Sequence, residues 1–315
     1  MPPWLFARWR AAYGERAEAI ASALLHEPPL DLSVKHDAAG WAKKLNGFVT
    51  ATGSVRIAPG ARIESLPGFA EGAWWVQDAA AALPARLLGD VAGKRVLDLC
   101  AAPGGKTLQL AAAGALVTAL DKSEPRLERL RENLARTRLR AEIVCTDALE
   151  FRAVEAFDAI LLDAPCTSTG TLRRHPDVAW LRRPNDVRTL AELQTKLLDA
   201  CAHLLRPGGR LVYAVCSLEP EENEDQVDQF LVTHPEFHRD PAPGVLEALR
   251  TPAGDLLLLG PAGAGPETLT LTFIRQLLSG LLSALAAEVV IRLPAVASRL
   301  AWPTAGRLQT FLFGR

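Results

Sequence analysis

Short apolar segments alternate with amphipathic segments along residues 94–216, and this alternation determines the predicted fold. Strands are expected at residues 95–99, 115–121, 141–147, 157–165 and 210–216, and helices are expected to begin near residues 107, 125 and 186. Each strand is almost wholly apolar, which is typical of strands covered by helices on both faces. The pattern therefore predicts an α/β fold, a doubly wound Rossmann-like domain built on a parallel sheet.

A different pattern precedes this domain. Apolar side chains recur at helical spacing from Trp4 to His26 and stop at Pro28, which predicts one long helix. A strand at residues 30–35, a helix at 37–46 and β-rich pieces at 48–59 are expected next. The chain is accordingly divided into a small N-terminal α+β region (1–65), the α/β domain (66–250) and a C-terminal segment (251–315).

The stretch from Lys94 to Lys106, KRVLDLCAAPGGK, joins a strand to a helix through a turn with two glycines. Gly104 and Gly105 lack a Cβ, so a ligand can approach the backbone at the helix start. Tight packing of the helix is the alternative explanation for these glycines. The turn has neither the GxGxxG form of dinucleotide sites nor a Walker sequence, so a nucleoside without a pyrophosphate, such as S-adenosylmethionine, fits better than NAD or ATP.

Carboxylates follow three of the predicted strands. Asp121 ends the second strand, where it can accept both hydroxyls of a ribose, and Asp147 follows the third, where it can take the exocyclic amine of an adenine. Asp163 ends the fourth strand. Helix capping is the competing role for Asp121, and capping of the next turn is the competing role for Asp147.

Five cysteines occur at positions 100, 145, 166, 201 and 216, without CxxC or zinc-type spacing. This usage predicts reduced thiols in a cytoplasmic protein and no metal site. Cys145 and Cys201 are expected to be buried packing residues. Cys166 and Cys216 directly follow the fourth and fifth strands, so we expect both thiols to face one pocket.

Methyl transfer to carbon 5 of cytosine is a reaction that needs such thiols. That carbon is a poor nucleophile until a thiolate adds to carbon 6, and a covalent step divides one hard reaction into easier ones. A carboxylic acid near the third nitrogen of the base would assist, and Asp163 is available. The spacing of Cys166 and Cys216 does not choose which thiol attacks.

The motifs VQDAAAALPA, DLCAAPGGKT, DAPCTSTGTLRRHPD and CSLEPEENE occur in this order between about residues 66 and 237. On these motifs the chain resembles the Nop/Sun family of RNA cytosine methyltransferases, of the RsmB type. The resemblance implies a class I methyltransferase domain that uses S-adenosylmethionine, with Cys216 as the nucleophile and Cys166 as the thiol that helps to release the methylated product. It implies that the cofactor site consists of Cys100, Ala101, Ala102, Pro103, Gly104, Gly105, Lys106, Asp121, Asp147 and Asp163.

The formal net charge is -1, so contact with a polyanion requires a local basic patch. Such a patch surrounds Trp180 and consists of Arg173, Arg174, Arg182 and Arg183, for which we expect phosphate contacts. Basic residues also recur at 122–140, where a solvated helix face balanced by glutamates is an equal alternative. The acidic run at 219–225 is expected to start a helix.

The expected substrate is therefore RNA, with ribosomal RNA favoured and transfer RNA as the alternative within the class. Because chemistry on a base requires it to leave its stack, an unpaired target is favoured. A non-catalytic RNA-binding assembly factor is the rival reading, and the two intact thiols speak against it. The N-terminal region is a possible RNA-binding element, and we expect a monomer.

The family's usual closing segment cannot be identified after about residue 250, so the last two strands are in doubt and the C-terminal tail is expected to diverge. We expect lower order there and an exposed sheet edge. The apolar run at 276–287 is too short to span a bilayer, which favours a docking helix and no membrane contact.

Overall fold

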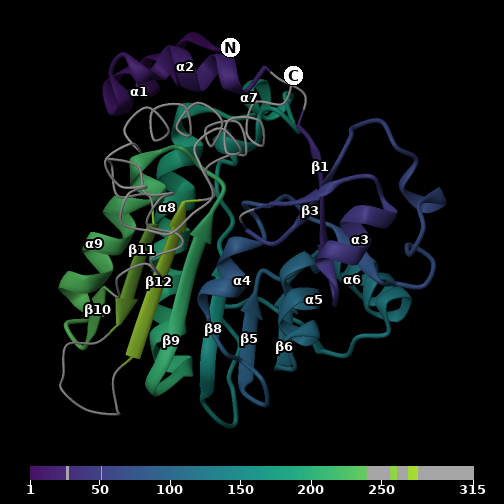
Figure 1. Cartoon of the computed structure of the whole chain (residues 1–315). Helices are drawn as coiled ribbons and strands as arrows, with labels where there is room; N and C mark the ends of the chain where they lie inside the picture. The colour runs from purple at the N-terminus through teal and green to yellow at the C-terminus, as the bar shows by residue number, and fades with distance from the viewer. Residues whose placement is uncertain (26–27, 51, 240–255, 261–268, 276–315) are drawn as a thin grey trace, which may run out of the picture.

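The computed structural model describes residues 1–25, 28–50, 52–239, 256–260 and 269–275. The strands of these residues form a large sheet of eight and a small sheet of four. The small sheet lies to one side of the large one, next to α3 (Ala38–Lys44) (Figure 1).

Parallel strands form the centre of the large sheet. They are β5 (Arg95–Leu99), β6 (Leu116–Asp121), β7 (Glu142–Cys145), β8 (Phe157–Asp163) and β9 (Leu205–Val215). Their spatial order is β7-β6-β5-β8-β9, and every neighbouring pair is parallel. The chain therefore reverses its progress across the sheet between β5 and β8, which is the switch point where doubly wound folds bind ligands. All five predicted strands are confirmed.

Helices cover both faces of this sheet, as the apolar strands predicted. Leu97 and Leu99 of β5 belong to one buried core, together with residues of α8 (Pro184–Leu204) and α9 (Glu224–Thr233). Val96, which points to the opposite face, packs with residues of α4 (Leu83–Leu87) and α5 (Gly105–Ala112). A third core joins α5 to α6 (Glu124–Thr137). The sheet is thus the middle of three layers, as predicted.

The small sheet is antiparallel. It contains β1 (Leu30–Val34), β2 (Phe48–Val49), β3 (Val55–Ile57) and β4 (Trp74–Val76), in the order β2-β3-β1-β4. Trp74 is buried in the core of this sheet, whereas Trp75 packs on the other side against α6. Both tryptophans therefore serve packing. The small sheet contains strands from both sides of the predicted domain boundary at residues 65–66, because β4 follows that boundary. The division into domains stays a prediction.

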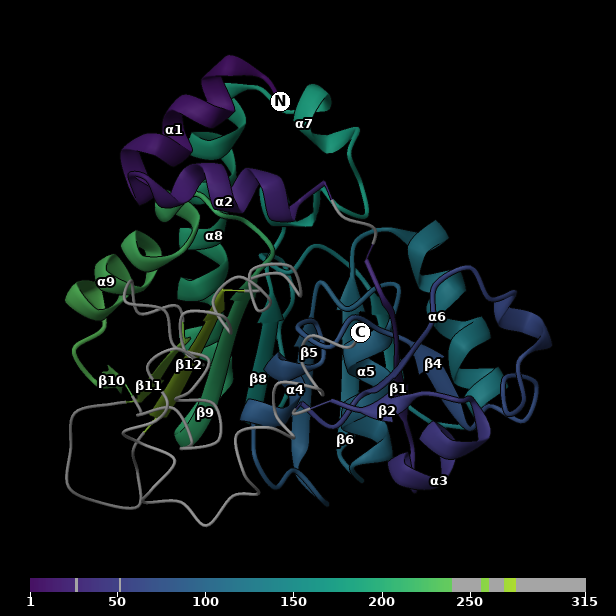
Figure 2. The same ribbon diagram turned by 45° about the horizontal axis from the view of Figure 1, so that its top comes forward.

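The N-terminal segment forms two helices, so the prediction of a single helix was wrong. α1 (Pro3–Tyr13) ends at Gly14, whose φ of 59° lies in the left-handed region that favours glycine, and α2 (Arg16–Ala23) starts the return. The helices pack against Leu172 and Leu218 of the α/β domain. Figure 2 shows them beside α7 (Val178–Leu181) and above α8.

Three further strands extend the large sheet beyond β9. β12 (Leu269–Arg275) pairs with β9, β11 (Leu256–Gly260) pairs with β12, and β10 (Phe237–Arg239) pairs with both β11 and β12. The last two strands thus exist, and β12 covers the edge of β9 that we expected to be exposed. The expected loss of order elsewhere after residue 250 and the docking helix at 276–287 lie outside the described residues. Among the described residues, none of the helices has both the length and the hydropathy of a membrane span.

Asp98 is a fully buried carboxyl inside β5, and the sequence analysis missed it. Its Oδ2 accepts a hydrogen bond of 2.6 Å from the hydroxyl of Thr107, which ties α5 to the strand. Its Oδ1 has no hydrogen-bond partner among the described residues. Burial raises the pKa of Asp98 to about 7. Its position as the polar residue in an otherwise apolar strand was the available signal.

We expect Asp98→Asn to remove a pH dependence from the stability of the protein. Folded Asp98 holds its proton more tightly than the unfolded chain does, so the wild type loses stability as the pH rises from the ordinary value of 3.8 to about 7. The loss relative to the variant should reach about 4 kcal/mol at most. Urea unfolding of both proteins across this pH range measures it. Glu150→Gln, at an exposed position, is the control, and parallel curves for wild type and Asp98→Asn would contradict the prediction.

Candidate active site

An ion pair crosses the switch point between β5 and β8. Lys106, the second residue of α5, places its Nζ 2.7 Å from Oδ2 of Asp163, the last residue of β8. The lysine is buried and the aspartate half-buried. Two predicted site residues that are 57 positions apart in the chain are thus joined at the carboxyl edge of the sheet.

The glycine turn packs closely against α6, which is the alternative explanation that we gave for Gly104. Gly104 has a φ of +105°, which favours glycine, and a Cβ there would lie 2.2 Å from a methyl group of Leu130. Gly105 begins α5, so the first N–H groups of that helix have no acceptor within it. Among the other predicted loop residues, Ala101 and Ala102 are buried, Pro103 is exposed, and burial raises the pKa of Cys100 to about 12, so that thiol stays protonated.

Asp121 holds the turn in place. Its Oδ2 accepts from the N–H of Ala102 at 3.2 Å and pairs with Arg126 at 3.2 Å, while its Oδ1 accepts from the N–H of Ser123. Asp147 follows the neighbouring strand, and its Oδ1 accepts from the N–H of Leu149 at 3.0 Å, which is the turn-capping role. Carboxylates at the ends of adjacent strands, next to the N-terminus of α5, can accept hydrogen bonds from the hydroxyls of a ribose and the amine of an adenine. These acceptors therefore fit a nucleoside cofactor.

The two thiols predicted to share a pocket lie in contact. Sγ of Cys166 is 3.3 Å from Sγ of Cys216, although the residues are 50 positions apart in sequence. Cys166 is buried and Cys216 is half-buried, so the second thiol is the more accessible. Cys201 is buried as predicted, whereas Cys145 is exposed because it lies at the end of the edge strand β7, and the prediction of its burial was wrong.

The surroundings favour the ionisation of one thiol over the other. The pKa of Cys216 is lowered, because Cys166 donates a hydrogen bond to it, and Ser168 and the charge of Lys106 act in the same direction. The pKa of Cys166 is raised, because it is the donor to Cys216 and because burial and the charge of Glu222 oppose its ionisation. The half-buried thiol is therefore the better thiolate.

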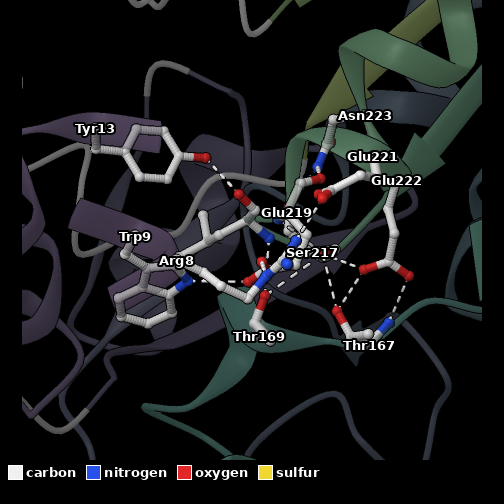
Figure 3. A network of polar contacts seen from close by, with 11 residues as sticks. Arg8, Trp9, Tyr13, Thr167, Thr169, Ser217, Glu219, Glu221, Glu222 and Asn223 are labelled. Carbon is white, nitrogen blue, oxygen red and sulfur yellow. Dashed lines mark hydrogen bonds and ion pairs between the residues drawn. The ribbon is translucent and has the colours of Figure 1, made fainter. Parts of the chain in front are cut away.

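A buried carboxylate connects the two loops that carry the thiols. Glu222 accepts from the N–H and the hydroxyl of Thr167, which follows Cys166, and from the hydroxyl of Ser217, which follows Cys216 (Figure 3). Gln194 of α8 donates to the same carboxylate at 3.1 Å. Burial raises the pKa of Glu222.

The acidic run that contains Glu222 was expected only to start a helix. α9 does begin at Glu224, but it is preceded by a 3-10 turn (Pro220–Glu222), and Glu219 and Glu222 are buried. The sequence analysis therefore missed the packing role of both glutamates. Their place in the motif CSLEPEENE, directly after Cys216, was the available signal.

The predicted basic patch is divided between internal and exposed residues. Arg174 pairs with Asp78 at 2.7 Å, and Arg182 donates to the carbonyl groups of Cys166 and Thr167, so both hold the structure together. These internal contacts do not test the expected phosphate contacts, which stay a prediction. Trp180, which is 71% exposed, stands on the surface with the exposed Arg183, and Arg173 is half-buried.

The basic residues at 122–140 fit the alternative of a solvated helix face that is balanced by glutamates. Arg131 pairs with Glu124 at 2.8 Å and with Glu128 at 2.9 Å on the surface of α6. Arg136 instead donates to the carbonyl groups of Phe69 and Trp74, which anchors the helix to the small sheet. These arginines are thus neutralised or used internally.

Comparisons with known proteins agree with this geometry. The model of the 16S rRNA methyltransferase RsmB/F family matches residues 85–250. Ribosomal RNA small subunit methyltransferase B of Klebsiella pneumoniae is 44% identical over 267 residues, which cover 80% of this chain and 60% of the relative. The protein of the same name from Vibrio cholerae is 43% identical over 250 residues, covering 75% of this chain and 58% of the relative. The chain thus spans up to 60% of the length of these two relatives.

A solved structure gives the same result. The methyltransferase homolog protein from Pyrococcus horikoshii is 30% identical and superposes with a TM-score of 0.65, over 76% of this chain and 86% of that one. The residues matched by the family model include the glycine turn, the three carboxylates and both thiols. The resemblance drawn from the motifs is confirmed, and S-adenosylmethionine is the cofactor. The chain belongs to the RsmB/F family of RNA methyltransferases.

Proposed function

We propose that this chain transfers a methyl group from S-adenosylmethionine to carbon 5 of a cytosine in ribosomal RNA, through a covalent adduct with Cys216. The observation that carries the proposal is the contact of 3.3 Å between the thiols of Cys166 and Cys216 at the carboxyl edge of the sheet. A site for methylating an amine or a hydroxyl group has no need of such a pair.

The bound cofactor would supply an electrophilic methyl group on its sulfonium. Asp121 and Asp147 would hold its ribose and its adenine, and the loop from Cys100 to Lys106 would let it approach the backbone. These roles are supported by the positions of the residues at the carboxyl ends of β5, β6 and β7.

Cys216 would add as a thiolate to carbon 6, which makes carbon 5 nucleophilic enough to accept the methyl group. A base then removes the proton from carbon 5, the bond between carbon 6 and sulfur breaks, and the thiolate of Cys216 leaves. Cys166, which already donates a hydrogen bond to Cys216, would assist this release. Cys166 keeps its proton at neutral pH because its pKa is raised.

The pair formed by Lys106 and Asp163 suits the pyrimidine ring. Thiolate addition shifts electron density onto the third nitrogen and the carbonyl group of the base, where a hydrogen-bond donor stabilises it. Both charged groups influence the pKa of Cys216, so they act within electrostatic range of the attacking sulfur. We assign the contact with the third nitrogen to Asp163, which lies 2.7 Å from Nζ of Lys106.

Ribosomal RNA is the substrate that the relatives' names support, since both are ribosomal RNA small subunit methyltransferases. Trp180 and Arg183 offer an exposed aromatic and a cation next to the loop of Cys166, which suits an unpaired RNA segment. Transfer RNA is the alternative substrate. A non-catalytic assembly factor has no use for a thiol whose pKa is lowered.

Replacing Cys166 by Ala should trap the protein on its RNA, because the adduct of Cys216 forms but is released slowly. Cys216→Ala should give neither adduct nor methylation. A denaturing gel with labelled RNA detects the adduct, and transfer of a labelled methyl group measures turnover. Cys145→Ala, at an exposed thiol on the edge strand β7, is the control, and full activity of Cys216→Ala would refute the mechanism.

We also expect the ionisation of Cys216 to depend on Cys166. In the RNA-free wild type, iodoacetamide should modify Cys216 at a lower pH than an ordinary thiol, because its pKa is lowered. Cys166→Ala removes the main hydrogen bond to the thiolate, so the pH at which half of the maximal rate is reached should rise. Peptide mass spectrometry at several pH values gives this profile. An unchanged profile would show that the thiol contact does not control ionisation.

The RNA class can be decided in cells. Bisulfite sequencing of total RNA, with and without the gene, should show a cytosine in small-subunit ribosomal RNA that loses its protection when the gene is absent. Complementation with the wild type should restore the signal, and Cys216→Ala should not. A lost signal in transfer RNA alone would replace the ribosomal substrate with the alternative.

A further inference from the structure

We propose that helix α1 positions the thiol of Cys216. In this proposal Arg8 and Trp9 donate hydrogen bonds to the buried Glu219, and this pair of contacts is called the α1 grip below. The inference rests on the proposed role of Cys216 as nucleophile. It assigns a positioning function to a helix more than 200 positions away in the chain.

The α1 grip is made by two donors on one buried carboxylate. Nε of Arg8 lies 2.6 Å from Oε2 of Glu219, and the indole Nε1 of Trp9 donates to Oε1 at 3.0 Å (Figure 3). Glu219 is 1% exposed and Trp9 is fully buried. The hydroxyl of Tyr13, one turn further along α1, donates to the carbonyl group of Leu218. Three side chains of one helix thus converge on two consecutive residues.

These two residues directly continue the segment of the nucleophile. The N–H of Glu219 donates to the hydroxyl of Ser217 at 3.0 Å, and the N–H of Leu218 donates to the hydroxyl of Thr169 at 2.9 Å. The carbonyl group of Cys216 itself accepts from the N–H of Gly170 at 2.9 Å. The chain from 216 to 219 is therefore held between α1 on one side and the loop after Cys166 on the other.

The energetics make the α1 grip hard to replace. A buried carboxylate that loses its partners carries a large desolvation cost, and the chain then moves to expose it. The apolar contacts between α1 and the domain, which include Leu5 and Leu218, hold the helix in place but cannot replace the two donors to the carboxylate of Glu219. We therefore expect loss of the α1 grip to shift the turn, and with it Cys216, while the fold persists.

The same guanidinium offers a matched control. Nη2 of Arg8 pairs with Oε1 of Glu221 at 2.6 Å, the same distance as the contact with Glu219. Glu221 is 45% exposed in its side chain, so water can replace its partner. If α1 positions Cys216, then substitution of Glu219 should lower kcat, whereas substitution of Glu221 should not.

The test compares Glu219→Gln and Trp9→Phe with Glu221→Gln in the full chain. Glu219→Gln removes the charge, and Trp9→Phe removes the indole N–H while it keeps an aromatic ring in the core. Both should lower kcat by about ten-fold to a hundred-fold, because a small displacement of a reacting group has this effect. The KM values for RNA and S-adenosylmethionine should stay within about two-fold of the wild type, since neither site is touched. Glu221→Gln should have the kinetics of the wild type.

A second readout separates positioning from general damage. The pH profile of Cys216 alkylation in the RNA-free protein should shift in Glu219→Gln and Trp9→Phe, while cofactor binding by calorimetry is retained. If Glu219→Gln does not fold, Trp9→Phe decides. The proposal is overturned if a folded Trp9→Phe or Glu219→Gln protein keeps both the wild-type kcat and the wild-type alkylation profile, or if Glu221→Gln loses as much activity.

Failure of this proposal is distinguishable from failure of the proposed function. If Cys216→Ala were active, the assignment of the nucleophile would be lost. The alkylation profile of Cys216 would still report whether α1 controls the placement of that thiol, because it requires no RNA and no turnover.

Discussion

The carboxylate of Glu222 is the interaction on which the arrangement of the site depends. It takes hydrogen bonds from Thr167 and Ser217, the residues that follow the two thiols, and from Gln194 of α8. A buried carboxylate with all its donors in place fixes the groups around it, because leaving one of them unpaired costs more than the bond itself contributes. The loops of β8 and β9 therefore have one mutual position, and the contact between their sulfur atoms follows from it.

The topology of the sheet makes that contact possible in the first place. Because β8 and β9 are parallel neighbours, the loops that follow them leave the sheet at the same edge. The switch point between β5 and β8 adds the glycine turn to this edge, and the ion pair between Lys106 and Asp163 joins the two. The cofactor turn, the carboxylates and the thiols thus meet at one edge of the sheet although they come from separate parts of the chain.

The elements of the α/β domain could be predicted because their signals are local. The predicted strands from β5 to β9 are mostly apolar, and the helices between them have apolar faces with helical spacing. The sequence predicted one N-terminal helix because the apolar periodicity continues across Gly14. The break depends on the left-handed backbone conformation of that single residue, which the periodicity does not reveal. The exposure of Cys145 depends on β7 being an edge strand, which only the pairing order reveals.

The support around the site was harder to predict, because it depends on contacts between distant segments. Arg174 and Arg182 belong to a basic patch in the sequence, yet their partners are Asp78 and the carbonyl groups of the loop of Cys166. Glu219 and Glu222 sit in an acidic run that resembles a helix start. Both glutamates are buried because α1 and the loop at 167–170 pack against them, and no local sequence pattern predicts these contacts.

Hydrogen bonding then distinguishes two thiols that spacing leaves equivalent. The pKa of Cys216 is lowered chiefly because Cys166 donates a hydrogen bond to it, and the charges of Asp163 and Lys106 act on it in opposite directions. The pKa of Cys166 is raised because it is the donor and is buried, and the charge of Glu222 adds to this effect. In a contact of 3.3 Å only one sulfur is readily ionised, since the second would face the charge of the first. The carboxylate that fixes the distance between the sulfur atoms thus also adds to the effects that keep the proton on Cys166. This leaves the more accessible sulfur as the nucleophile, which supports the proposed assignment on physical grounds that are independent of any relative.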